Sequence, residues 1–230
     1  MRSSHVTLAA SAAALLAAAT FGAAPAMADS GWTRLTAPGT TVFDEAPPGA
    51  GDAPAPDARP QPAPLDAEAE GLAVGDTYGD VFRALKDDNS CSRFFGGPRV
   101  AVTVFNEFAR RLRLKTLGVE YVGLVMTGSY TLYKDERSGA LYRLFDEATI
   151  NSSGPFSPAP PPSRARFKVG RFRAATRSAR ALMLLHELGH LIRGPDGWLL
   201  PNDGGDRALS DRNTRTVESR CIEQLHALRE

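Results

Sequence analysis

A stretch of twenty residues without proline, Ala174–Arg193, constrains the fold of this chain more than any other segment. From Ala181 to Leu191 the apolar residues would occur on every side of a helix, which indicates a buried helix rather than a surface helix. The same segment contains His186, Glu187 and His190, in the order H-E-x-x-H. Polar side chains on a buried helix are costly unless something compensates them, so this turn is the first candidate for a functional site.

The spacing of these polar residues is typical of a metal site. Residues four apart lie on the same face of a helix, so His186 and His190 can both reach one ion. Glu187 projects about 100° from His186 and about 60° from His190, given 3.6 residues per turn. It would therefore lie beside the ion, where it can hold a water molecule and accept its proton. We predict a zinc site with two histidine ligands and Glu187 as general base. The alternative is two hydrogen-bonded core histidines and a surface acid.

Gly189, inside the motif, is unfavourable in a helix interior by about 1 kcal/mol relative to alanine. A close approach of another backbone or of a substrate would explain it. We therefore expect either a neighbouring segment or a substrate to lie close to this side of the helix.

The N-terminus predicts export. Arg2 is followed by the apolar segment Val6–Phe21 and by Ala26-Met27-Ala28, so residues 1–28 are interpreted as a signal peptide. The apolar segment is too short and too rich in alanine for a convincing membrane span, so we expect no span after signal removal. Removal of the signal peptide takes away Arg2, one of the 27 Lys and Arg residues, and leaves 26 positive charges against 26 Asp and Glu residues. This balance gives no electrostatic reason to expect nucleic acid as a partner. The predicted location is secreted or in the cell envelope.

The chain has two cysteines, Cys91 and Cys221. In an exported protein a disulfide between them is the expected state. The bond would connect the start of the folded domain to its last helix. The alternative, in which both thiols join the metal site, is disfavoured because the pair lacks a C-x-x-C spacing.

Composition divides the rest of the chain in two. Residues 29–71 are interpreted as a disordered spacer, because the part from Ala37 to Pro64 holds eight prolines and few large apolar residues. Residues 72–230 are long enough for one folded domain. Periodicity in this domain predicts several elements: a helix over Arg99–Leu114, strand-like segments at Tyr121–Met126, Ser129–Tyr133 and Ala140–Phe145, the motif helix, and a last helix over Ser210–Leu228. We therefore expect an α+β fold with an N-terminal helix, a small antiparallel sheet, the motif helix and a C-terminal helix.

His186, Glu187 and His190, together with this order of elements, resemble the zincin superfamily of metallopeptidases. The resemblance is close in the motif and holds only in outline elsewhere in the domain. It implies a zincin-like domain in which His186 and His190 bind zinc, Glu187 activates a water molecule and a third ligand lies downstream. It also implies a peptide or protein substrate.

Three acidic residues are candidates for the third ligand. Asp203 is the first choice, because the stretch from Asn202 to Cys221 resembles the tail of small exported bacterial proteins with H-E-x-x-H, where an aspartate before glycine is a regular element. Alternatively, Asp203 only forms a turn with the glycine that follows it. Glu218 lies on the last helix, as the third ligand does in the gluzincins. Asp196 has the metzincin spacing, ten residues after the first histidine, but Arg193 stands where that subgroup has glycine.

These features predict an exported zinc-dependent peptidase that hydrolyses peptide bonds with a metal-activated water. The alternative is a catalytically inactive zincin-like binding or envelope module in which the metal is structural. A third hypothesis, an envelope protein with an accidental motif, requires both histidines to be ordinary core residues.

Overall fold

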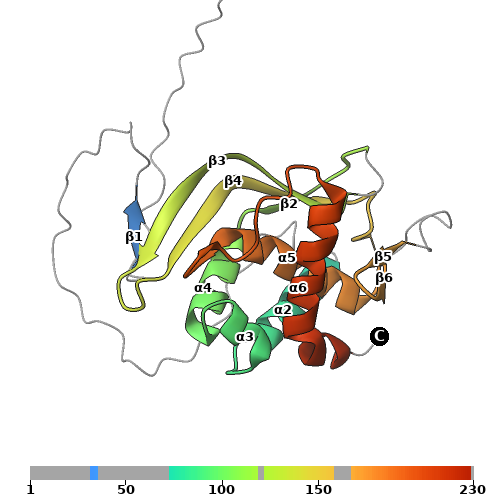
Figure 1. The fold of residues 1–230 in the computed structure, drawn as a ribbon. Coiled ribbons are helices and arrows are strands. Elements are labelled where there is room, and N and C mark those ends of the chain that lie inside the picture. The colour runs from blue at the N-terminus through green and yellow to red at the C-terminus, as the bar shows by residue number, and fades with distance from the viewer. Residues whose placement is uncertain (1–31, 36–72, 119–121, 158–166, 229–230) are drawn as a thin grey trace, which may run out of the picture. The chain divides into compact units, whose positions relative to one another are not determined.

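The computed structural model describes residues 32–35, 73–118, 122–157 and 167–228 (Figure 1). The predicted signal peptide and most of the predicted spacer lie outside these residues. Within the spacer segment, β1 (Trp32–Leu35) is a short strand that pairs with the sheet described below. No helix among the described ranges is long and apolar enough to cross a membrane.

The centre of the sheet is an antiparallel pair, β3 (Leu124–Asp135) and β4 (Leu141–Asn151). A tight turn joins them, in which the amide of Asp135 donates to the carbonyl of Ala140 at 2.8 Å. The strand-like segment predicted at Ala140–Phe145 forms the start of β4, and its antiparallel pairing with β3 agrees with the expected antiparallel sheet. The two strand-like segments predicted before the turn form the single strand β3, whose register shifts between Thr127 and Tyr130. Tyr121, where the first segment was expected to begin, lies outside the described residues.

Other strands pair along the two sides of this hairpin. On the far side of β4 lie β2 (Leu112–Lys115), which pairs with its C-terminal end, and β7 (Ile192–Gly194), which pairs with its N-terminal end. β8 (Gly197–Trp198) pairs with β7, and β1 pairs with the end of β3. The β2–β4 pairing is parallel, so the described sheet is mixed, whereas the sequence analysis expected a small antiparallel sheet.

The first predicted helix is shorter than its periodicity indicated. α4 (Pro98–Ala109) begins with proline at its first turn and ends before β2. Leu112 is buried, but it is the first residue of β2, where parallel pairing with β4 satisfies the hydrogen-bonding groups of the backbone. Tertiary pairing therefore overrides the helical spacing of the last apolar residues.

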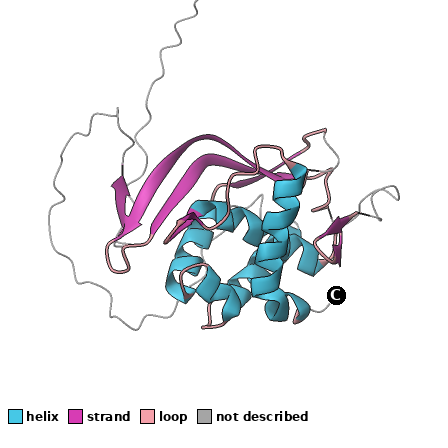
Figure 2. Cartoon of the chain, viewed as in Figure 1, coloured by secondary structure: helices cyan, strands magenta, loops and turns pink. Residues whose placement is uncertain are grey.

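Four more helices and a small hairpin complete the described fold. The helices are α2 (Ala73–Leu85), α3 (Ser90–Phe94), α5 (Arg177–Leu191) and α6 (Arg207–His226). β5 (Lys168–Val169) and β6 (Phe172–Arg173) form a separate two-stranded sheet just before α5. In Figure 2 the helices lie together on one side of the long β3–β4 ribbon. The architecture is α+β, as the sequence predicts.

α5 is the buried helix that the sequence predicts around the motif. The side chain of Thr176 caps its N-terminus by accepting a hydrogen bond from the amide of Ala179 at 3.2 Å. Leu182, Leu185 and Leu188 are among its fully buried side chains. Each contributes roughly 1.5–3 kcal/mol through burial. The motif is therefore held on a rigid element of the core.

The two cysteines form a disulfide between α3 and α6. Their Cα atoms are 4.3 Å apart, and both side chains are fully buried. The predicted pairing of Cys91 with Cys221 is confirmed, and no free cysteine remains in the part of the chain that the structure describes. The bond fixes the second half of α6 to the first helices of the domain.

Candidate metal site

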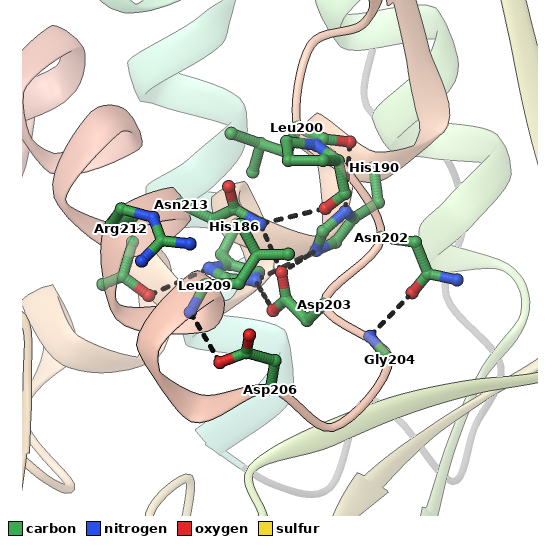
Figure 3. Close-up of polar contacts among 12 residues, drawn as sticks. His186, His190, Leu200, Asn202, Asp203, Gly204, Asp206, Leu209, Arg212 and Asn213 are labelled. Carbon is green, nitrogen blue, oxygen red and sulfur yellow. Dashed lines mark hydrogen bonds and ion pairs between the residues drawn. The ribbon is translucent and has the colours of Figure 1, made fainter.

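Three side chains meet where α5 faces the loop before α6. They are His186, His190 and Asp203, and their ligand atoms all lie within 4.8 Å of one another (Figure 3). The two Nε2 atoms are 3.1 Å apart. Asp203 Oδ2 lies 3.1 Å from Nε2 of His186, and Oδ1 lies 3.7 Å from Nε2 of His190. The structure thus brings together the three residues that the sequence predicts as metal ligands.

The outer nitrogen of each imidazole has a partner of its own. Nδ1 of His190 lies 3.4 Å from the carbonyl oxygen of Leu200. Because a carbonyl only accepts, Nδ1 carries the hydrogen and Nε2 presents its lone pair to the group. Nδ1 of His186 is 2.9 Å from the hydroxyl of Thr214 on α6. Histidines that bind metals usually donate their outer N–H to such a partner, which fixes the orientation of the ring.

The geometry of the group fits a divalent metal ion. In the ligand forms both Nε2 atoms present lone pairs, 3.1 Å apart and facing a carboxylate, which is repulsive unless a cation or a proton lies between them. Ligands about 2.0–2.1 Å from a tetrahedral zinc ion are roughly 3.3 Å from one another, close to the distances found here. Imidazole and carboxylate donors also suit other divalent metals, so the group could hold a metal ion, and its donors do not fix which metal.

The charges of the group favour the ligand forms of His190 and Asp203, and the protonated form of His186. Burial disfavours the charged form of His186, but the hydrogen bond to Asp203 and the charges of Glu187 and Asp203 together raise its pKa. Burial and the nearby charge of His186 lower the pKa of His190 to about 4. Burial acts to raise the pKa of Asp203, but hydrogen bonds from His186 and Ser210 and the charges of both histidines lower it to about 2. At neutral pH His190 is therefore neutral and Asp203 ionised, as metal binding requires.

Glu187 lies beside the group and has a different electrostatic environment. Burial raises the pKa of its carboxyl to about 7, although the charge of His186 opposes this shift. Its residue is half-buried, and among the described residues it has no hydrogen-bond or ion-pair partner. A carboxyl that titrates near neutral pH and is not held by a partner is suited to exchanging protons.

The loop before α6 places the carboxylate of Asp203. Asn213, buried on α6, donates to the carbonyl oxygen of Pro201 at 2.9 Å and also to Oδ1 of Asp203. Asp206 caps α6 by accepting from the amides of its first turn at 2.8 and 3.1 Å. The main chain of Asp203 also takes part in a turn, since its carbonyl accepts from the amide of Asp206 at 2.7 Å. Asp203 is therefore a turn residue, as the alternative interpretation expects, but its side chain also lies against the two histidines.

Asn213 and Thr214 support the group, and the sequence analysis did not single them out for this role. Each makes its contact from α6, on the side of the helix that also carries the buried residues Val217 and Cys221. The available signal was the position of polar residues on that face, because a buried polar side chain needs a partner.

Gly189 is explained by a close approach, as the sequence predicts. A Cβ atom at this position would lie 2.6 Å from Cδ1 and 2.7 Å from Cγ of Leu200. The amide of Leu200 also donates to the carbonyl of Gly189 at 3.1 Å. The absence of a side chain lets the segment that leads to Asp203 pass against the motif helix.

The two alternative acidic ligands lie elsewhere. Glu218 is buried on α6 and accepts hydrogen bonds from the amide and the Nε of Arg171, at 3.1 and 2.5 Å. It therefore fastens the β5–β6 hairpin to α6. Asp196 is exposed in the turn between β7 and β8. Neither belongs to the group of ligand atoms found among the described residues.

Comparisons of the chain with protein-family models, curated proteins and solved structures gave no match. A mixed α and β fold supports many unrelated activities. What the chain does must therefore be inferred from the chemistry of this site.

Proposed function

We propose that this chain is an exported zinc-dependent peptidase with a zincin-like fold. One observation carries the proposal: two imidazole nitrogens and a carboxylate converge within 4.8 Å, and Glu187, which has no hydrogen-bond partner among the described residues, follows the first ligand on the same helix turn. A metal site with three protein ligands leaves a position open for substrate or water, which is the usual arrangement of catalytic zinc. The export proposal has support from the disulfide and the signal-like N-terminus.

Zinc bound here would supply Lewis acidity, which polarises the scissile carbonyl and makes a nearby water molecule more acidic. His186, His190 and Asp203 would hold the ion. Their outer partners, Thr214, Leu200 and Asn213, would keep the rings and the carboxylate in place.

Glu187 would move the proton during hydrolysis of a peptide bond. Its carboxylate accepts a proton from the water as the water oxygen bonds to the carbonyl carbon. As the carbon–nitrogen bond breaks, the same carboxyl delivers that proton to the leaving amine. A pKa of about 7 suits both transfers, since neither form of the carboxyl is strongly favoured at neutral pH.

A structural metal site is the second candidate function. Both histidines are only 6% exposed, and the group connects α5 to the loop that precedes α6. In this case the ion would hold these two helices together, and Glu187 would have no role in chemistry.

Substitution of Glu187 by glutamine separates the two functions. The amide has nearly the size of the carboxyl but cannot accept the proton, so zinc content and thermal stability are expected to stay close to wild type. Peptidase activity should fall at least about 10²-fold. Metal analysis of the purified chain, thermal unfolding and cleavage of a peptide library provide the readouts. Activity that survives Glu187→Gln would refute the general-base role, and a zinc-binding wild type that cleaves no peptide would favour the structural site.

The third ligand is tested by a matched pair of variants. Asp203→Asn removes the charge from the group, so zinc affinity should fall by at least about tenfold and activity should fall with it. Glu218→Gln removes a carboxylate from α6 at the hairpin contact and should leave zinc affinity unchanged. Affinities are compared by competition with a chromophoric chelator. Loss of zinc in Glu218→Gln but not in Asp203→Asn would contradict the ligand assignment.

A further inference from the structure

A buried arginine lies behind the second histidine of the motif. Arg143 projects from β4, is only 8% exposed, and donates from Nε to the carbonyl oxygen of His190 at 2.9 Å. The residues that contact one another here are 47 positions apart in the sequence. Arg143 therefore ties the sheet directly to the backbone of a metal-ligand residue.

Aromatic rings hold the guanidinium of Arg143 in place. Its Cζ atom lies 4.1 Å from the ring centre of Trp198, 5.5 Å from that of Phe145 and 5.6 Å from that of Tyr130. Each contact is within the range of a cation–π interaction. Because these rings come from β3, β4 and β8, the guanidinium cannot turn away from His190 without losing packing on three strands.

The contact is made where the motif helix ends. α5 ends at Leu191, and β7 follows immediately. The last carbonyls of a helix have no partner within it, and a positive charge near them is favourable. Arg143 supplies both the hydrogen bond and the charge. The neighbouring residue Tyr142 pairs with Ile192 of β7, so two successive residues of β4 fix the chain as it leaves the helix.

His190 is consequently held from two sides. Arg143 binds its backbone carbonyl, and the carbonyl of Leu200 accepts from Nδ1 of its ring. With the backbone and the outer ring nitrogen both fixed, Nε2 is directed at the other two ligand atoms. We propose that Arg143 is a positioning residue that orients His190 for metal binding, an inference that rests on the proposed zinc site.

Two substitutions of nearly equal length isolate the hydrogen bond. Methionine at position 143 keeps an apolar stem but has no donor. Glutamine places an amide nitrogen at the same distance along the side chain as Nε of arginine, so it can still donate to His190. Zinc affinity should fall about 10- to 100-fold in Arg143→Met, the range found when an outer partner of a metal ligand is lost. Arg143→Gln should recover a substantial part of that loss.

Arg177→Met is the control for the loss of a buried arginine contact. Arg177 lies at the first turn of the same helix, nine residues before His186, and binds the buried carboxylate of Asp80 at 2.6 and 3.0 Å. This variant should lower the melting temperature of the metal-free protein without changing zinc affinity.

Zinc affinity by chelator competition and the melting temperature of the metal-free protein are measured for all four proteins. A low affinity in Arg143→Met with recovery in Arg143→Gln supports the inference. Wild-type affinity in Arg143→Met, or an equal loss in both variants, would overturn it while the zinc site stands. If the wild type binds no zinc, the proposed function fails, and the inference fails with it.

Discussion

Removing the disulfide should cost this domain a large part of its stability. The bond joins residues 130 positions apart. In the chain-entropy model, a closed loop of this size corresponds to about 5 kcal/mol at 25 °C. Removal of native disulfides typically costs about 2–5 kcal/mol. Because small domains are stable by only about 5–15 kcal/mol, we expect the double variant Cys91→Ala/Cys221→Ala to be folded but much less stable.

Urea unfolding, followed by circular dichroism with metal removed from both proteins, measures this difference. The slope of the unfolding free energy against urea should also rise in the variant, since an unfolded chain without the cross-link exposes more surface. Wild-type protein treated with a reductant controls for packing around the buried sulfur atoms, because it loses the bond but keeps both cysteines. A loss below about 1 kcal/mol in both proteins would refute the reasoning.

Two further substitutions probe the packing and the charges away from the ligand atoms. Gly189→Ala gains about 1 kcal/mol of helix propensity but forces its Cβ against Leu200, and such overpacking typically costs about 1–3 kcal/mol. Thermal unfolding should therefore show lower stability, and chelator competition should show weaker zinc binding. A variant as stable as wild type with unchanged zinc affinity would contradict this. Asp135 is buried, which acts to raise its pKa, but hydrogen bonds from Arg99 and from its own turn lower the pKa of its carboxyl overall. Its charge therefore stabilises the fold above about pH 4 and ceases to do so as the pH falls through the lowered pKa. Asp135→Asn should be less stable by about 1–3 kcal/mol at pH 7, and chemical unfolding at several pH values should show the difference shrinking below pH 4; a difference independent of pH would contradict the assignment.

The motif helix and its two histidines could be predicted because the information is local. Helical periodicity places His186 and His190 on one face whatever surrounds them, and the apolar residues on all sides of the segment indicate burial. The structure places α5 as expected and brings Asp203 to the histidines. Asp203 was favoured by resemblance; its spacing alone did not distinguish it from Glu218 or Asp196.

Other parts of the fold depend on partners that are distant in sequence. Leu112 continues the helical spacing of α4, yet it lies in a strand because β4 offers parallel pairing. Arg143 is a single charged residue between apolar neighbours in the predicted strand, and only the packing of β4 against the end of α5 reveals its contact with His190. Single-sequence patterns describe one element at a time, so contacts of this kind lie beyond them.

The ligand group and the disulfide differ greatly in the length of chain that each encloses, which bears on the order of folding. His186 and Asp203 are 17 residues apart, whereas the cysteines are 130 apart. Closing the shorter loop costs about 2 kcal/mol less entropy, and contacts between nearby residues generally form faster. Available metal can therefore organise α5 and the start of α6 before the cysteines meet. By bringing α6 into place early, the site would favour docking of the first helices and the final oxidation of the thiols.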